Sequence, residues 1–170
     1  MKQLILFPLI FLTLNLNAQI ELGLYADKIT FFGDGNFNKI GTLDIKATMD
    51  WRSDLETHSF ALKTQYEYAD LYGGYYSRFT VGLGAYIPIN NFEIGGFANI
   101  GLIKRKGVET PLTYSILGEV NYKLTDKFSI SSQLEYVYRS DLDVLWNDKN
   151  VWKINGLIGI KYKFKDNWKL

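Results

Sequence analysis

Residues 43–51 read LDIKATMDW, a run in which apolar and polar side chains alternate without a break. The apolar members are Leu43, Ile45, Ala47, Met49 and Trp51, and the polar members between them are Asp44, Lys46, Thr48 and Asp50. Because successive side chains of a β-strand point to opposite faces, the run predicts a strand with one apolar and one polar face.

Seven further runs follow the same rule, and each has about the 10 residues that a tilted membrane-spanning strand needs. The eight predicted strands cover residues 20–29, 42–51, 59–68, 75–87, 92–103, 114–124, 128–139 and 151–164. No segment predicts a helix. The pattern therefore predicts an all-β fold, an eight-stranded antiparallel up-and-down transmembrane β-barrel.

The connections between the predicted strands alternate in length, which suggests an orientation. Those at 31–41, 69–74, 104–113 and 140–150 are long or contain glycine, those at 88–91 and 125–127 are tight, and 52–58 is intermediate. Bacterial outer-membrane barrels have short periplasmic turns and longer outer loops. This order predicts a bacterial outer-membrane protein with both termini in the periplasm.

The N-terminal residues have the composition of a cleaved secretory signal. Lys2 precedes an apolar run from Leu4 to Leu14, and a polar stretch then leads to Ala18. The run is shorter than the about 20 residues of a transmembrane helix. We expect residues 1–18 to be removed and residues 19–170 to form one barrel domain.

Composition excludes several other kinds of site and partner. Without Lys2 the chain has 18 basic and 18 acidic residues, so no net charge attracts nucleic acid. The chain has no cysteine, which excludes disulfides and thiolate metal sites. The sequence predicts no catalytic residues, no metal and no cofactor.

The apolar face should point toward lipid rather than into the barrel. It carries more side chains than the interior of an eight-stranded barrel can hold. Its aromatic residues also gather at the strand ends, around an aliphatic middle, as on lipid-facing surfaces. One end has Trp51, Phe60, Phe92, Tyr122, Phe128, Tyr162 and Phe164; the other has Tyr66, Tyr68, Tyr75, Tyr114, Tyr136, Tyr138 and Trp152. A periplasmic lipid binder with its apolar face inward is the alternative.

The signal, the eight alternating runs, the loop order and the closing segment Gly159-Ile160-Lys161-Tyr162-Lys163-Phe164 resemble the small eight-stranded outer-membrane barrels. Outer-membrane protein X and the transmembrane domain of outer-membrane protein A belong to that group. The resemblance implies assembly by the outer-membrane barrel assembly machinery, which reads a last strand ending in an aromatic residue. Phe164 fits that role, although the tail from Lys165 to Leu170 follows it.

The polar face carries charges of both signs that should meet inside the barrel. The predicted network contains Lys46, Lys63, Glu67, Arg78, Glu119 and Glu135, and Glu93, Arg139 and Lys153 share the same face. Buried charges are costly unless they are paired, so these residues predict a structural polar plug. A narrow channel for small solutes is the alternative function.

Two features of the connections invite functional interpretations. Lys104, Arg105 and Lys106 open the third outer loop, where basic residues could contact lipopolysaccharide phosphates or merely be solvated. The loop at 140–150 mixes acidic and apolar residues, which favours self-packing over a binding tip.

His58 lies beside Ser59, which suggests the His–Ser pair of a lipid A-modifying barrel enzyme. Neighbours in a strand point to opposite faces, however, so His58 is expected to be a turn residue.

Taken together, the sequence predicts a non-enzymatic structural or surface-interaction protein of the outer membrane. Its expected partners are outer-membrane lipid, lipopolysaccharide and an extracellular ligand of unknown identity, and not nucleic acid.

Overall fold

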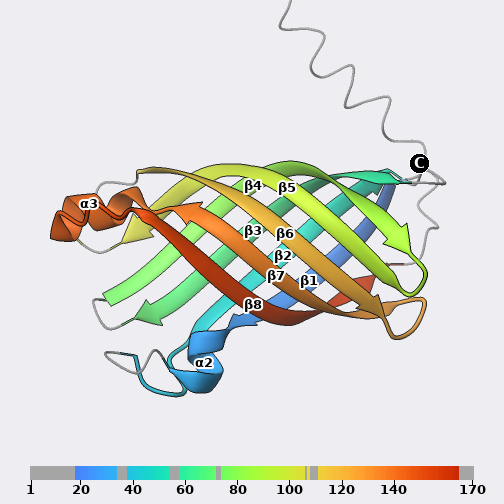
Figure 1. Ribbon diagram of the computed structural model, residues 1–170, viewed down its shortest axis with the longest axis horizontal. Coiled ribbons are helices and arrows are strands. Elements are labelled where there is room, and N and C mark those ends of the chain that lie inside the picture. The colour runs from blue at the N-terminus through green and yellow to red at the C-terminus, as the bar shows by residue number, and fades with distance from the viewer. Residues whose placement is uncertain are drawn as a thin grey trace, which may run out of the picture.

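Eight antiparallel strands form a closed barrel in the computed structural model, which describes residues 18–33, 38–53, 58–71, 74–105, 107 and 111–164 (Figure 1). The strands are β1 (Ala18–Asp27), β2 (Asp44–Ser53), β3 (Ser59–Leu71), β4 (Gly74–Ile89), β5 (Phe92–Arg105), β6 (Leu112–Lys123), β7 (Phe128–Tyr138) and β8 (Trp152–Lys163). Each strand pairs with the next along the chain, and β8 returns to pair with β1 from Glu21↔Lys163 to Asp27↔Leu157. The predicted eight-stranded antiparallel barrel is confirmed.

The two ends of the barrel differ, and we name them by what they carry. The turn end holds the two-residue turn Asn90–Asn91, the bend at 124–127, the start of β1 and the end of β8. The helix end holds two short helices, α2 (Lys28–Phe32) between β1 and β2, and α3 (Ser140–Trp146) between β7 and β8. Figure 1 shows α3 extending beyond the strands along the long axis, whereas α2 lies beside the wall.

The helices correct the expectation that the chain has none. The Asp27 carboxylate accepts a hydrogen bond from the Ile29 amide (2.9 Å), which caps α2, so β1 ends before the predicted Ile29. Gly33 at φ 65° ends α2, and Asn147 at φ 51° ends α3. Helices of five and seven residues are too short to show a helical period in the sequence.

In the part of the chain that the structure describes, neither helix is long and apolar enough to cross a membrane.

The strand that ends near the basic triplet is also longer than predicted. Lys104 and Arg105 belong to β5, where they pair with Ser77 and Tyr76 of β4, rather than to a loop. Charged residues do not stop a strand when the alternation continues, and among the described residues Gly107 has a positive φ of 83°. Lys106 is outside the described residues.

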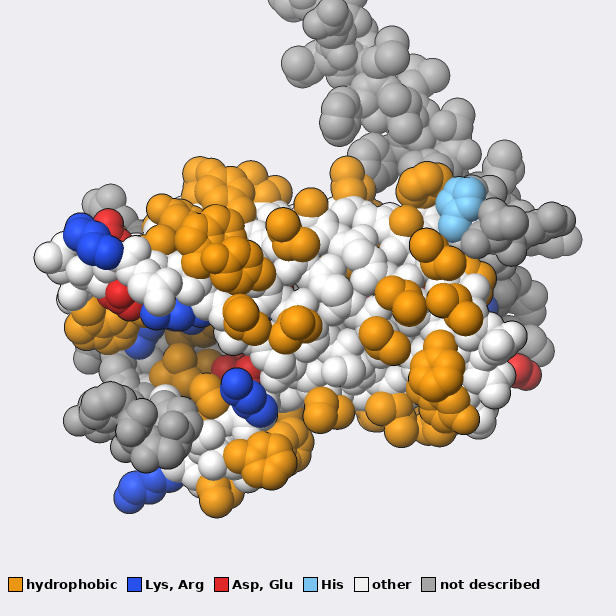
Figure 2. All heavy atoms as spheres, viewed as in Figure 1, with side chains coloured by type: hydrophobic (Ala, Val, Ile, Leu, Met, Phe, Trp, Pro, Cys, Tyr) orange, Lys and Arg blue, Asp and Glu red, His pale blue; other side chains and the backbone are white. Residues whose placement is uncertain are grey.

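The apolar face of the barrel points outward. Leu83, Ile116 and Ile158, near the middles of three strands, have exposed fractions of 62%, 67% and 59%. Figure 2 shows hydrophobic side chains along the wall, with charged side chains mainly toward the ends of the barrel. The predicted alternative with the apolar face inward is therefore wrong.

Aromatic side chains form a ring near each end of the exterior. At the turn end, Phe128 packs against Tyr162 and Phe92 against Tyr122, each with ring centroids 5.0 Å apart. At the helix end, the Tyr136 and Trp152 rings stack at 4.7 Å. Each of these contacts joins two members of the same predicted aromatic set, with one set at each end of the barrel.

The signal-peptide prediction lies outside the described residues, except for Ala18, which begins β1.

Candidate functional site: the charged lumen and the two mouths

The lumen, the space inside the wall, is crossed by one cluster of buried charges. This central cluster consists of Asp50 of β2, Lys63 of β3, Tyr86 of β4, Glu119 of β6 and Lys161 of β8. The Lys63 ammonium lies 2.8 Å from both Asp50 and Glu119, and the Lys161 ammonium lies 2.7 Å from Asp50 and 2.9 Å from Glu119. Two lysines and two carboxylates therefore neutralise each other inside the barrel, at strand positions nearer the turn end than the helix end.

The central cluster spans the full width of the lumen. Lys161 donates a hydrogen bond to the Tyr86 hydroxyl (3.0 Å), although β8 and β4 are on opposite sides of an eight-stranded ring. The Tyr86 hydroxyl, which has one proton to donate, lies 2.7 Å from a carboxylate oxygen of Asp50 and 2.9 Å from a carboxylate oxygen of Glu119. Bonds between opposite walls leave these side chains filling the cross-section.

A second cluster, the helix-side cluster, lies next to it toward α3. It consists of Lys46, Glu67, Arg78 and Glu135, all buried. Arg78 bridges Glu67 (2.8 Å) and Glu135, and Lys46 also contacts Glu135. The Ser115 hydroxyl donates a further hydrogen bond to Glu135. Two cations and two carboxylates balance here as well, so this cluster also satisfies the requirement that buried charge be paired.

At the turn end, Arg52 forms the floor of an open cavity. Its guanidinium contacts Glu21 (2.8 Å) and Glu93, and donates to the Ser59 hydroxyl (2.8 Å). The same guanidinium lies over the Tyr86 ring, 4.0 Å from its centroid, which joins the floor to the central cluster. The cavity above the floor has a volume of about 410 Å³ and a polar lining. It is a vestibule that ends at the plug.

At the helix end, Asp141 of α3 reaches into the barrel. Its carboxylate accepts hydrogen bonds from Arg139 (2.8 Å) and Arg105 (3.2 Å), and the Arg105 guanidinium lies 4.5 Å from the Trp146 ring centroid. Burial by itself raises the pKa of the Asp141 carboxyl, but the hydrogen bond and charge of Arg139, followed by those of Arg105, bring the pKa below its ordinary value. This mouth cluster holds α3 over the end of the lumen.

Comparison with solved structures places the chain among small eight-stranded outer-membrane barrels in fold. Ail, an outer-membrane protein of Yersinia pestis whose backbone structure was determined in a phospholipid bilayer nanodisc, superposes with a TM-score of 0.58 at 13% identity. The match covers 87% of this chain and 99% of Ail. A crystal structure of Ail gives a TM-score of 0.50 at 11% identity, over 87% of this chain and 98% of that one. At such identities the likeness shows the fold alone.

Comparison of the sequence with known families and proteins finds no relative. No protein-family model matches the chain, and no curated protein sequence matches it. The function must therefore be argued from the residues themselves.

The structure places the predicted charge network in two clusters rather than one. Lys46, Glu67, Arg78 and Glu135 meet in the helix-side cluster, while Lys63 and Glu119 belong to the central cluster. Lys153 is not among them, because its ammonium is half-exposed and pairs with Asp148 near the helix end (3.1 Å).

Sequence reasoning missed four charged members of the lumen network, Glu21, Asp50, Arg52 and Lys161, and the uncharged Tyr86. Their positions in the alternating pattern of each strand indicate that they face the lumen. Asp50 and Lys161 lie on the polar faces of their strands, and the same alternation that identified Lys63 also marks them. Arg52 and Glu21 continue that parity toward the strand ends.

The alternation of β5 places two residues of the predicted basic triplet on opposite faces of the wall. Arg105 points inward to Asp141, while Lys104 is exposed on the outer wall. His58 precedes β3 and packs edge-on against the Phe60 ring, with centroids 5.2 Å apart. Ser59 accepts a hydrogen bond from Arg52 inside the barrel, and both His58 and Ser59 line the turn-end cavity.

Proposed function

We propose that this chain is a non-enzymatic barrel of the bacterial outer membrane with a closed lumen, acting through the surface at its helix end. The observation that carries the proposal is the inverted distribution of polarity. The wall exposes aliphatic side chains around the barrel, and the charged side chains of the strands pair inside it. In water such an exposed belt would drive aggregation, whereas lipid tails match it.

The connections support an orientation with the helix end outside the cell. Bacterial barrels keep short turns on the periplasmic side and longer loops on the outer side. The Asn90–Asn91 turn and both strand termini lie at one end, and the segments that contain α2 and α3 lie at the other. This arrangement supports the proposal that both chain termini lie in the periplasm.

A conducting channel is the competing function, and the central cluster argues against it. Opposite walls are joined through Lys161 and Tyr86, and Lys161 and Arg52 both belong to the lining of the turn-end cavity. Purified protein in planar lipid bilayers should therefore show no steady unitary conductance. A reproducible conductance that changes in a Lys161→Ala variant would show that the lumen conducts and would contradict the closed barrel.

Lys104 is the residue we propose for contact with phosphate-bearing outer-membrane lipid. It borders a groove of about 380 Å³ on the outer wall, whose other lining residues are Tyr66, Tyr68, Tyr75, Ser77, Phe79 and Leu102. The groove suits an acyl chain, and the ammonium suits a phosphate at the membrane surface. The contact is with lipid that surrounds the barrel, at the level of the helix-end aromatic ring.

The lipid contact predicts a difference between two exposed lysines. A Lys104→Ala variant should retain less lipopolysaccharide through detergent extraction than the wild type. A Lys123→Ala variant, changed at an exposed lysine near the turn end, should retain the wild-type amount. Phosphate analysis of the purified proteins measures both. Equal retention in the two variants would remove Lys104 as a lipid contact.

A further inference from the structure

The connection between β1 and β2 exposes more apolar surface per side chain than any other described part of the molecule. Phe32 of α2 and Ile40 have exposed fractions of 76% and 75%, the two highest values among the large apolar side chains that the structure describes. Phe31 is exposed as well, and α2 has no buried residue. Phe32 and Ile40 therefore leave about three quarters of their surface uncovered in the folded protein.

The position of α2 is fixed by polar contacts at its base. The Thr30 hydroxyl donates to the Asp44 carbonyl and accepts from the Asp44 amide, both at 3.2 Å. The Gly41 amide donates to the Thr30 carbonyl (3.0 Å). These bonds attach both sides of the connection to the start of β2, so the exposed side chains are held in place.

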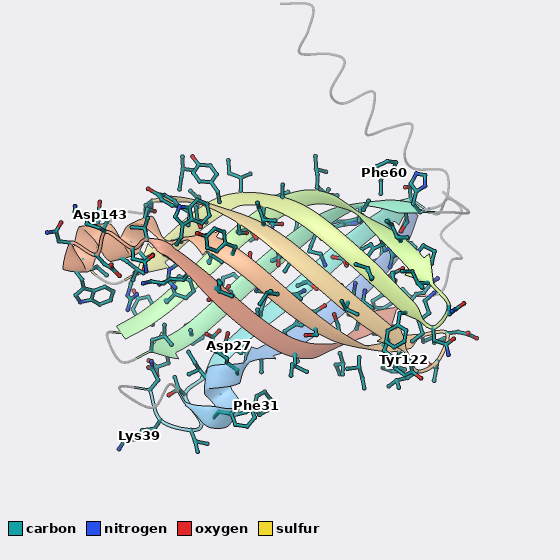
Figure 3. The ribbon with its side chains drawn as sticks, in the orientation of Figure 1. Asp27, Phe31, Lys39, Phe60, Tyr122 and Asp143 are labelled. Carbon is teal, nitrogen blue, oxygen red and sulfur yellow. The ribbon has the colours of Figure 1, made fainter. Side chains whose placement is uncertain are left out.

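Figure 1 shows α2 outside the wall and closer to the barrel's middle than α3, which extends past the end of the strands. Figure 3 shows Phe31 projecting alongside the wall, while Lys39 lies nearer the α3 end. Along the barrel axis, Phe31 therefore lies nearer the lipid belt than Lys39 does. This order matches the change from acyl chains to phosphates in a membrane leaflet.

We propose that Phe31, Phe32 and Ile40 form a lipid-binding foot that inserts into the membrane leaflet at the helix end, beside the barrel. The foot is continuous with the exposed belt, because α2 follows directly from β1, whose Leu24 faces outward. Lys28 and Lys39 are both exposed and flank the apolar residues, as basic residues do on segments that lie in an anionic membrane surface. The inference rests on the proposed membrane location of the barrel.

The absence of cysteine from the sequence allows a direct depth measurement with single labels. Three variants, Phe32→Cys, Leu83→Cys and Val144→Cys, each receive a nitroxide and are folded into vesicles of phosphatidylcholine and phosphatidylglycerol. Leu83 lies in the middle of the belt and reports the lipid interior. Val144 is exposed on α3 beyond the wall and reports water. Collision rates with oxygen, which concentrates in lipid, and with a water-soluble nickel chelate then give the depth of each label.

The foot predicts that the Phe32 label meets oxygen in preference to the nickel chelate, closer to the Leu83 label than to the Val144 label. A Phe32 label as accessible to nickel as the Val144 label would overturn the foot and leave α2 as a surface for a protein partner. If the Leu83 label were itself in water, the proposed membrane barrel would fail instead. Gel mobility before and after boiling verifies that each variant is folded.

Discussion

Lys63 and Lys161 are the residues on which the interior depends most. Both ammonium groups lie between Asp50 and Glu119, and Lys161 reaches Glu21 as well (2.9 Å). The side chains of Lys63, Asp50 and Glu119 have no exposed surface. Removing one cation would leave carboxylates without their counter-charge in a place that water does not reach.

Replacement of Lys63 by alanine should therefore destabilise the barrel by about 3–5 kcal/mol, the usual cost of removing one partner of a buried ion pair. Lys153→Ala is the matched control. Its pair with Asp148 is exposed to solvent and screened, so this variant should unfold close to the wild type. Urea unfolding in detergent micelles measures both variants. A Lys63→Ala protein as stable as the control would show that the central cluster does not stabilise the fold.

At this scale the sequence predicts which residues face inward but not which ones meet. Strict alternation assigned Lys46, Lys63, Glu67, Arg78, Glu119 and Glu135 to the polar face. Partners depend on the register across the lumen, and the distance between opposite walls is not encoded in any single strand. The pairing of Arg78 with Glu135, from β4 and β7, is of this kind.

Among the elements, α3 depends most on a single anchor. Asp141 is the one buried residue of this helix, and its carboxylate binds both Arg139 and Arg105. Asp143, two residues later, is exposed and pairs only at the surface with Lys149 (3.2 Å). The anchor explains how a seven-residue helix can persist, since short helices are marginal without tertiary contacts.

An Asp141→Asn variant should lose this anchor, and its α3 amides should exchange with solvent faster than those of the wild type. Asp143→Asn is the control and should leave the exchange unchanged. Hydrogen exchange followed by mass spectrometry of the 139–151 segment distinguishes the two. Loss of protection in both variants, or in neither, would contradict the anchoring role of Asp141.

The same anchor has a defined pH dependence. The pKa of Asp141 in the folded protein is lowered by Arg139 and Arg105 despite its burial, so the stabilisation is fully present above the unfolded pKa. It is lost as the pH falls through the lowered folded value. Protection of α3 should thus hold at neutral and mildly acidic pH, and weaken only below the ordinary aspartate range.

For the helices and strands, the sequence pattern predicts the strands but neither their exact ends nor the short helices. Alternation located all eight strands, with ends that differ by up to three residues, because side-chain parity does not tell where a turn begins. It gave no sign of α2 or α3. Their formation depends on the Asp27 cap in one case and on the Asp141 anchor in the other, which are contacts rather than periodicities.

For the whole molecule, the distribution of polarity is the feature that ties fold to function. Exposed aliphatic residues encircle the barrel between two aromatic rings, and the buried positions are largely charged or polar. The sequence predicts this arrangement because the apolar load is too large for the interior of eight strands. It does not identify a ligand, since no residue pattern at the helix end encodes one.

The central claim, an inside-out barrel in the outer membrane, is tested most directly by the electrophoretic mobility of the mature protein from outer-membrane fractions. Folded membrane barrels resist detergent until they are heated, so unboiled and boiled samples should migrate differently. Release of the protein by osmotic shock, together with the same mobility before and after boiling, would contradict the account.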